Sequence, residues 1–160
     1  MNQRFRLATA LSAAALMLSA CASAPAPKNL ADTIATTPQL STLNRLVVSA
    51  GLTSTLQGPG PLTVFAPSDD AFKALPAKTL ESLSTDKVAL AKLLSFHVVP
   101  ATVLSADAKN GNVKTVQGAN VAVFKAGPFL TVEDAVVTTA DTVATNGVVQ
   151  IIDRVLTLPK

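Results

Sequence analysis

The chain of 160 residues contains no tryptophan and no tyrosine, and it has one cysteine and one histidine. One cysteine cannot form an internal disulfide or a cysteine-based zinc site, and one histidine excludes a multi-histidine metal site. Because six phenylalanines are the only aromatic residues, the core must be mainly aliphatic. The glycines form neither a phosphate-binding loop nor a dinucleotide-binding motif, and no Gly-x-Ser-x-Gly elbow is present. We therefore predict that the protein is not an enzyme and needs no cofactor and no metal.

Charge is also scarce, at 14% of residues, with a formal net charge of +3. Residues 1–20 hold Arg4 and Arg6, and without them 11 basic side chains face 10 acidic ones. A nearly neutral chain without a basic stripe or aromatic platforms is a poor binder of nucleic acid. We therefore predict no nucleic-acid partner.

The first twenty residues have the pattern of a secretory signal. Met1–Arg6 is short and positive, Leu7–Leu18 is apolar, and the small residues Ser19 and Ala20 follow. The apolar run is too short for a membrane-spanning helix, which needs about 20 apolar residues. We predict that residues 1–20 are a signal peptide.

The tetrapeptide Leu18–Cys21 resembles the bacterial lipobox. The resemblance implies that the thiol of Cys21 receives a diacylglyceryl group and that the signal is cut before it; the alternative is an ordinary signal with a cysteine near the cut. Ala22 stands where an aspartate would resemble an inner-membrane retention signal, so the resemblance favours the outer membrane. The Ala- and Pro-rich residues 21–28 are typical of a semi-rigid spacer, and one folded domain is expected over residues 29–160.

Helical patterns come first in this domain and strand patterns later, which predicts an α+β fold rather than a parallel α/β sheet. Capping residues predict helix starts at Thr37-Pro38, Ser68 and Thr85-Asp86. The Asn146-Gly147 pair predicts a two-residue hairpin. The predicted strands are Leu62–Ala66, Val113–Val116, Val121–Phe124, Phe129–Val132, Val136–Thr138, Asp141–Thr145 and Val148–Leu156, with an extended segment at His97–Pro100.

Three stretches together resemble the fasciclin domain. They are LTVFAPSDDAFKALP at 62–76, LLSFHVVP at 93–100 and DTVATNGVVQIIDRVLTLP at 141–159. The resemblance implies a twisted β-wedge, or compact sandwich, with several helices packed over it. It also implies an adhesion module that is secreted or attached to a surface.

The same resemblance suggests partner-binding residues. In animal relatives, an Asp-Ile pair before the Asn-Gly turn and a Tyr-His segment are linked to integrin binding. The Asp position is Asp141, with Thr142 at the Ile position, and Phe96 and His97 occupy the Tyr-His positions. Gln150 stands where a histidine is common. The structural alternative for Phe96, His97 and Asp141 is a place in the core or in a turn.

Other polar residues have simpler explanations. His97 lies between apolar neighbours, which favours a buried structural role; a hydrolase would require a serine and an acid beside its ring. Asp69 and Asp70 follow Ser68 and face a helix N-terminus. Asp153 interrupts an apolar strand, so it should point outward or be hydrogen-bonded inside.

These observations favour a lipid-anchored cell-envelope protein that acts in adhesion or surface interaction. Its partners would be the membrane, through the N-terminal lipid, and a protein or polysaccharide surface. The alternative is a periplasmic ligand-binding or envelope-maintenance lipoprotein. The expected location is the outer membrane, facing the periplasm or the exterior.

Overall fold

A computed structural model describes residues 27–157. The predicted signal peptide, Cys21 and most of the predicted spacer lie outside the described residues. No helix within 27–157 is both long enough and apolar enough to cross a membrane. The helices of this part are α1 (Leu30–Thr36), the 3-10 turn η1 (Pro38–Leu40), α2 (Ser41–Ser49), α3 (Thr53–Leu56), α4 (Asp69–Lys73), α5 (Ala77–Thr85) and α6 (Lys87–Phe96).

Seven strands form one mixed sheet with the order β2-β1-β7-β6-β5-β4-β3. The first and last strands of the chain, β1 and β7, pair in parallel, and every other neighbouring pair is antiparallel. The prediction of an α+β fold of the fasciclin type, with helices over a twisted wedge, is confirmed. The strands are β1 (Leu62–Pro67), β2 (Val98–Val99), β3 (Gly111–Lys114), β4 (Asn120–Ala126), β5 (Phe129–Val132), β6 (Ala135–Ala144) and β7 (Gly147–Ile152).

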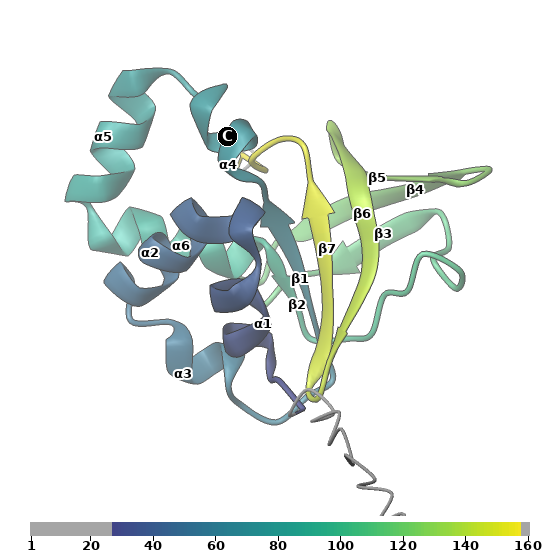
Figure 1. Ribbon diagram of the computed structural model, residues 1–160. Coiled ribbons are helices and arrows are strands. Elements are labelled where there is room, and N and C mark those ends of the chain that lie inside the picture. Colours follow the sequence, from purple (N-terminus) through teal and green to yellow (C-terminus); the bar gives the residue numbers. More distant parts are fainter. Residues whose placement is uncertain (1–26, 158–160) are drawn as a thin grey trace, which may run out of the picture.

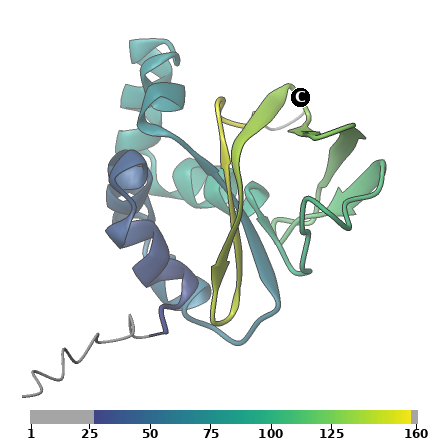
Figure 2. The ribbon, with the colours of Figure 1, turned by 45° about the vertical axis from the view of Figure 1, so that its right-hand side comes forward.

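The sheet has a helix-covered part and a ribbon part. The helices cover one face of β1 and β7, while β3, β4 and β5 bend away from them on the opposite side (Figures 1 and 2). Successive side chains of β1 and β7 point to opposite faces of the sheet and so belong to two separate cores. Val64 and Val149 point into the aliphatic core under the helices, whereas Phe65 and Ile152 point into a second core enclosed by the ribbon. Burial on both faces explains why β1 and β7 are almost continuously apolar.

The predicted helix starts are largely correct. Ser68 caps α4, its hydroxyl accepting from the amide of Ala71, and Asp86 caps α6. Thr37 differs from the prediction, because its hydroxyl donates to the carbonyl of Thr33 and so closes α1 instead of capping the next helix. Helices α1, α3 and α5 were not predicted from the sequence, because they are short or peripheral and their apolar residues show no clear helical periodicity.

The predicted hairpin exists, but its loop lies one residue earlier than expected. Ala144 pairs with Gly147, so the two loop residues are Thr145 and Asn146, and Gly147 is the first residue of β7. Gly147 is required for a different reason: a Cβ there would overlap the carbonyl oxygen of Leu62 on β1. The glycine allows the hairpin to approach the neighbouring strand.

The two strands predicted at Val136–Thr138 and Asp141–Thr145 form one strand, β6. Its pairing with β7 shifts register between Val137 and Thr142, which is the signature of a bulge. Asp141 lies in this bulge with φ of 56°, a left-handed conformation in which Asp and Asn are enriched among non-glycine residues. The bulge turns the Asp141 side chain toward the loop that follows β2.

Candidate functional site

The carboxylate of Asp141 is the centre of a polar cluster. Its Oδ1 accepts hydrogen bonds from the Ser105 amide and from Gln150 Nε2, each at 2.8 Å, and its Oδ2 accepts from the Ser105 hydroxyl. Gln150 is fully buried, and its Oε1 accepts from the amide of Asp141 at 3.0 Å. Its Nε2 also donates to the carbonyl of Val103 at 2.9 Å. One buried amide thus joins β6, β7 and the loop after β2.

The cluster favours a charged Asp141. Partial burial raises the pKa of this carboxyl, but hydrogen bonds from Ser105 and Gln150, together with the charge of Lys125, hold the pKa below its usual value. A second contact fixes the same loop: the Thr63 hydroxyl donates to the carbonyl of Ala101 and accepts from the amide of Val103. Asp141 therefore positions the loop that follows β2, and its carboxylate is half-buried.

Asn146 forms a second polar junction in the β6–β7 turn, and this turn is at the lower end of the hairpin in Figure 1. Its Oδ1 accepts from the amide of Leu30, the first residue of α1, at 2.9 Å. Its Nδ2 donates to the carbonyls of Leu56 and Gly58, both at 2.8 Å, and its own carbonyl accepts from Leu62. The amide side chain of Asn146 therefore joins the start of α1 to the end of α3, and its backbone carbonyl adds the start of β1.

Phe96 and His97 lie in the interior, each 1% exposed, with their rings edge to face at 6.5 Å. The Nε2 of His97 accepts from the amide of Leu156 at 2.9 Å, which leaves the proton on Nδ1 to donate to the carbonyl of Leu93 at 2.8 Å. Burial lowers the pKa of His97 to about 4, so the ring is neutral at physiological pH. Neither ring presents surface to a partner, and Asp141 is the only one of the three resemblance-based residues near the surface.

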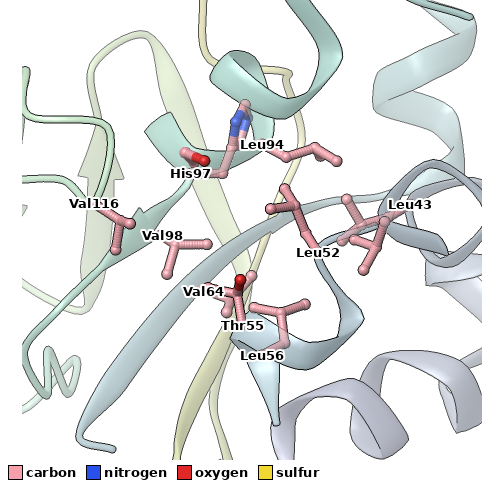
Figure 3. A pocket seen from close by; sticks show the side chains of 11 residues that line it. Leu43, Leu52, Thr55, Leu56, Val64, Leu94, His97, Val98 and Val116 are labelled. Atoms are coloured by element: carbon pink, nitrogen blue, oxygen red, sulfur yellow. The ribbon is translucent and has the colours of Figure 1, made fainter. Parts of the chain in front are cut away.

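A catalytic role for His97 finds no support in this geometry. Both ring nitrogens are paired with backbone groups, so neither faces a serine hydroxyl or a carboxylate. The ring borders a cavity of about 20 Å³ with an almost entirely apolar lining, shown in Figure 3 among Leu52, Leu94 and Val98. Small-molecule sites typically occupy about 300–1,000 Å³, so this cavity is a packing gap rather than a substrate pocket.

The predicted helix-start aspartates have separate tasks. Asp69 lies in the first turn of α4 but reaches back to α2, where its Oδ1 accepts from the amide of Thr42 and its Oδ2 from the Ser41 hydroxyl, both at 2.8 Å. It therefore caps α2, a helix without a capping side chain of its own. Partial burial raises the pKa of Asp69, but these hydrogen bonds and the charge of Lys73 leave it lowered overall. Asp70 forms an exposed ion pair with Lys73.

Asp153 directly follows β7, which ends at Ile152, so it does not interrupt the strand; of the two predicted alternatives, it is the hydrogen-bonded one. Its Oδ1 accepts from the amide of Val136 at 2.7 Å, and its amide donates to the carbonyl of the same residue. Within residues 27–157, no group of three or more His, Cys, Asp or Glu side chains is arranged to hold a metal ion. The aspartates described above are thus bonded to backbone amides and to neighbouring side chains of the same chain.

Comparison with known proteins matches this arrangement to one family. The family model described as "Fasciclin domain" matches residues 38–159. The chain is 41% identical to Protein sll1483 of Synechocystis over 74% of its own length and 67% of that protein's. It is 38% identical to the cell surface glycolipoprotein MPB83 of Mycobacterium bovis, over 76% of the chain and 57% of the relative.

Among solved structures, a FAS1 domain pair from the insect cell adhesion molecule Fasciclin I has a similar fold. The TM-score is 0.60 at 23% identity, covering 74% of this chain and 45% of the insect chain. At this identity the match supports the fold alone.

Proposed function

The chain belongs to the fasciclin domain family, and from this premise we propose that it is a lipid-anchored cell-envelope protein whose fasciclin domain mediates adhesion or surface interaction. The family match over residues 38–159 carries the proposal, because members of this family are surface or adhesion modules and not enzymes. One relative, MPB83, is itself named a cell surface glycolipoprotein. Cys21, at the end of the predicted signal, is the proposed lipid attachment point.

The start of the described chain supports a short tether. The carbonyl of Lys28 accepts from the amide of Thr145, which fixes the chain beside the β6–β7 turn. Six residues lie between Cys21 and Lys28, which makes seven Cα-to-Cα steps, so a fully extended tether would reach about 25 Å. A diacylglyceryl group has two chains and supplies the double signal that stable membrane anchoring needs. We infer that this end of the domain faces the membrane.

The anchor and the adhesive activity can be tested separately. Mass spectrometry of the protein from its native membrane should find a diacylated Cys21 at the mature N-terminus, whereas an intact leader or a free thiol would refute the anchor. Cys21→Ser should release the protein from the membrane fraction and reduce attachment of the cells that make it. Unchanged attachment by cells carrying the released form would argue against adhesion.

A periplasmic role for the same lipoprotein remains the second proposal. Protease treatment of intact cells distinguishes the two, since a surface-facing domain is degraded and an inward-facing domain is protected. The apolar cavity beside His97 is too small for a typical ligand. A ligand-binding role would therefore have to use an open groove. One such groove, of about 640 Å³, lies beside the β6–β7 turn.

A further inference from the structure

Two phenylalanines lie at the surface of the β4–β5 hairpin. The exposed fractions are 51% for Phe124 and 63% for Phe129, whereas Phe65, Phe72 and Phe96 are buried. Phe124 pairs with Thr131 and Phe129 with Ala126, so the two rings are diagonal neighbours on one face of the hairpin. Diagonal positions are about 7–8 Å apart, close enough for aromatic side chains to form one continuous surface.

This face points away from both cores. Val121 and Val123 of β4 and Leu130 of β5 face inward, so the alternating residues, including both phenylalanines, face solvent. We call the outward side of β3, β4 and β5 the ribbon face. Around the rings it carries Asn112, Asn120, Ala122, Ala126 and Thr131.

The ribbon face has little charge. Its strands contribute Lys114, and the turn after β5 contributes Glu133, whose carboxylate accepts from the amide of Ala122 at 2.7 Å. One positive and one negative group give no net attraction for a polyanion, which excludes nucleic acid and anionic lipid as matching partners. The face offers amides, a hydroxyl and two flat rings instead.

The ribbon face is also distant from the predicted anchor. The β4–β5 hairpin joins the sheet at the Ala135 end of β6, whereas Lys28 lies beside the other end, next to Thr145 (Figure 1). β6 has ten residues, so the two ends are about 30 Å apart. A domain tethered through Cys21 would therefore present its ribbon face away from its own membrane.

The size of the apolar surface limits the partner. The two exposed rings together offer about 200 Å² of apolar surface, well below the roughly 800 Å² per partner of a stable protein interface. A small aromatic surface with neighbouring amides and hydroxyls suits a sugar chain instead, because rings stack on the apolar faces of pyranoses while amides bond their hydroxyls. Weak contacts of this kind become firm attachment when many copies bind one polymer.

We propose that the ribbon face, through Phe124 and Phe129, binds neutral polysaccharide. This inference rests on the proposed adhesive function and assigns its partner class and its surface. The rings supply the stacking contacts, and the amides of Asn112 and Asn120 supply hydrogen bonds to sugar hydroxyls. The Thr131 hydroxyl donates to the carbonyl of Phe124 at 3.2 Å, so it serves as an acceptor.

The test measures co-sedimentation of the full chain, purified in detergent, with cellulose, chitin, agarose and cross-linked dextran. The double variant Phe124→Ala/Phe129→Ala should lose roughly tenfold or more in affinity for the polymer that the wild type binds, because both stacking surfaces are removed. The matched control is Val48→Ala/Val88→Ala, which removes exposed apolar groups from α2 and α6 and should leave binding unchanged.

A second variant distinguishes stacking from general apolar contact. Phe124→Leu/Phe129→Leu keeps apolar side chains without rings and should bind as poorly as the alanine variant. Wild-type affinity of the leucine variant would overturn the proposal, because the polymer would then be bound without stacking on aromatic rings. Failure of the wild type to bind any of the four polymers would also overturn it, while Cys21-dependent cell attachment would leave the adhesive function standing. Far-UV circular dichroism must show that each variant is folded.

Discussion

The β6–β7 hairpin contains two polar junctions, one around Asn146 at the turn and one around Asp141 at the bulge. Asn146 is neutral, and its side chain contacts only backbone groups, from α1, from the end of α3 and from the loop after it. Asp141 is charged, half-buried, and fastens one peripheral loop through Ser105 and Gln150. The first junction is part of the fold itself, whereas the second can change with pH or with a partner without separating the sheet from the helices.

The largest effect is expected at the turn. Gly147→Ala would place a Cβ on the carbonyl oxygen of Leu62 and force β7 away from β1. We expect a loss of roughly 4 kcal/mol or more in the free energy of unfolding, measured by urea denaturation followed by circular dichroism. Gly118→Ala is the control, because Gly118 has φ of 104° but open space around it. A smaller loss for Gly147→Ala than for Gly118→Ala would refute the close approach of hairpin and strand.

Removal of the Asn146 side chain should have the next largest effect. Asn146→Ala leaves the Leu30 amide and the carbonyls of Leu56 and Gly58 without their partner. We expect a loss of about 3 kcal/mol in unfolding free energy. Asn112→Ala, on the exposed edge strand β3, is the matched control and should change stability little. Equal losses of unfolding free energy for the two variants would show that the Asn146 side chain does not hold α1 and α3 to the hairpin.

As the pH falls, protonation of the buried His97 should lower the free energy of unfolding before the carboxylates become protonated. Because the folded-state pKa of His97 is about 4 and its unfolded value about 6.5, the unfolded chain binds the extra proton between these values. Stability is therefore complete above about pH 6.5 and falls as the pH drops toward 4, by about 2 kcal/mol between pH 7 and pH 5. Urea denaturation at several pH values measures this slope.

His97→Asn is the variant that isolates this effect. It should be less stable at pH 7, since the contacts to Leu93 and Leu156 are disturbed, but its stability should change little between pH 7 and pH 5. His97 is the only histidine in the chain, so no other imidazole can account for the slope. A variant that kept the wild-type slope would contradict the burial of a neutral ring.

The smallest effect is expected at the bulge. Asp141→Asn keeps an acceptor for the Ser105 amide and tolerates the left-handed backbone, but it loses the charge and places an amide group near Gln150. We expect a loss of about 1 kcal/mol at pH 7. Because the pKa of Asp141 is lowered on folding, this contribution is present above the unfolded pKa and disappears as the pH falls through the folded value.

Hydrogen exchange gives the sharper measurement for Asp141→Asn. The variant should speed exchange at the amides of Val103 and Ser105 while leaving Leu62 and Leu30 protected, because only the loop is released. Faster exchange throughout the sheet would show that Asp141, like Asn146, supports the whole fold and not one loop only.

Local signals in the sequence predicted the local structure well. Strand β5 has the predicted bounds Phe129–Val132, and the capping roles of Ser68 and Asp86 follow from side chains that bond the next few amides. Short helices such as α3 were missed because a single turn has no period to detect. The parallel pairing of β1 with β7 joins strands about 80 residues apart, and no local pattern specifies such a pairing.

The candidate site was predictable only in part. Asp141 was identified by resemblance, but its partner Ser105 lies in a loop without any motif. Gln150 was noticed as a departure from the family pattern, and the structure shows why an amide suits that position: it must both donate to Asp141 and accept from it. Asn146 was predicted as a turn residue, while its bonds to α1 and to the segment after α3 depend on chain far from the hairpin.

The central place of β7 also determines when this domain can form. β7 lies between β1 and β6, so every earlier strand can be made while the middle of the sheet is still missing. A growing chain emerges from the ribosome with β1 first, and β1 must wait for its parallel neighbour until residues 147–152 have been synthesised. The central position of β7 therefore means that the sheet of a growing chain stays incomplete until residues 147–152 have been added.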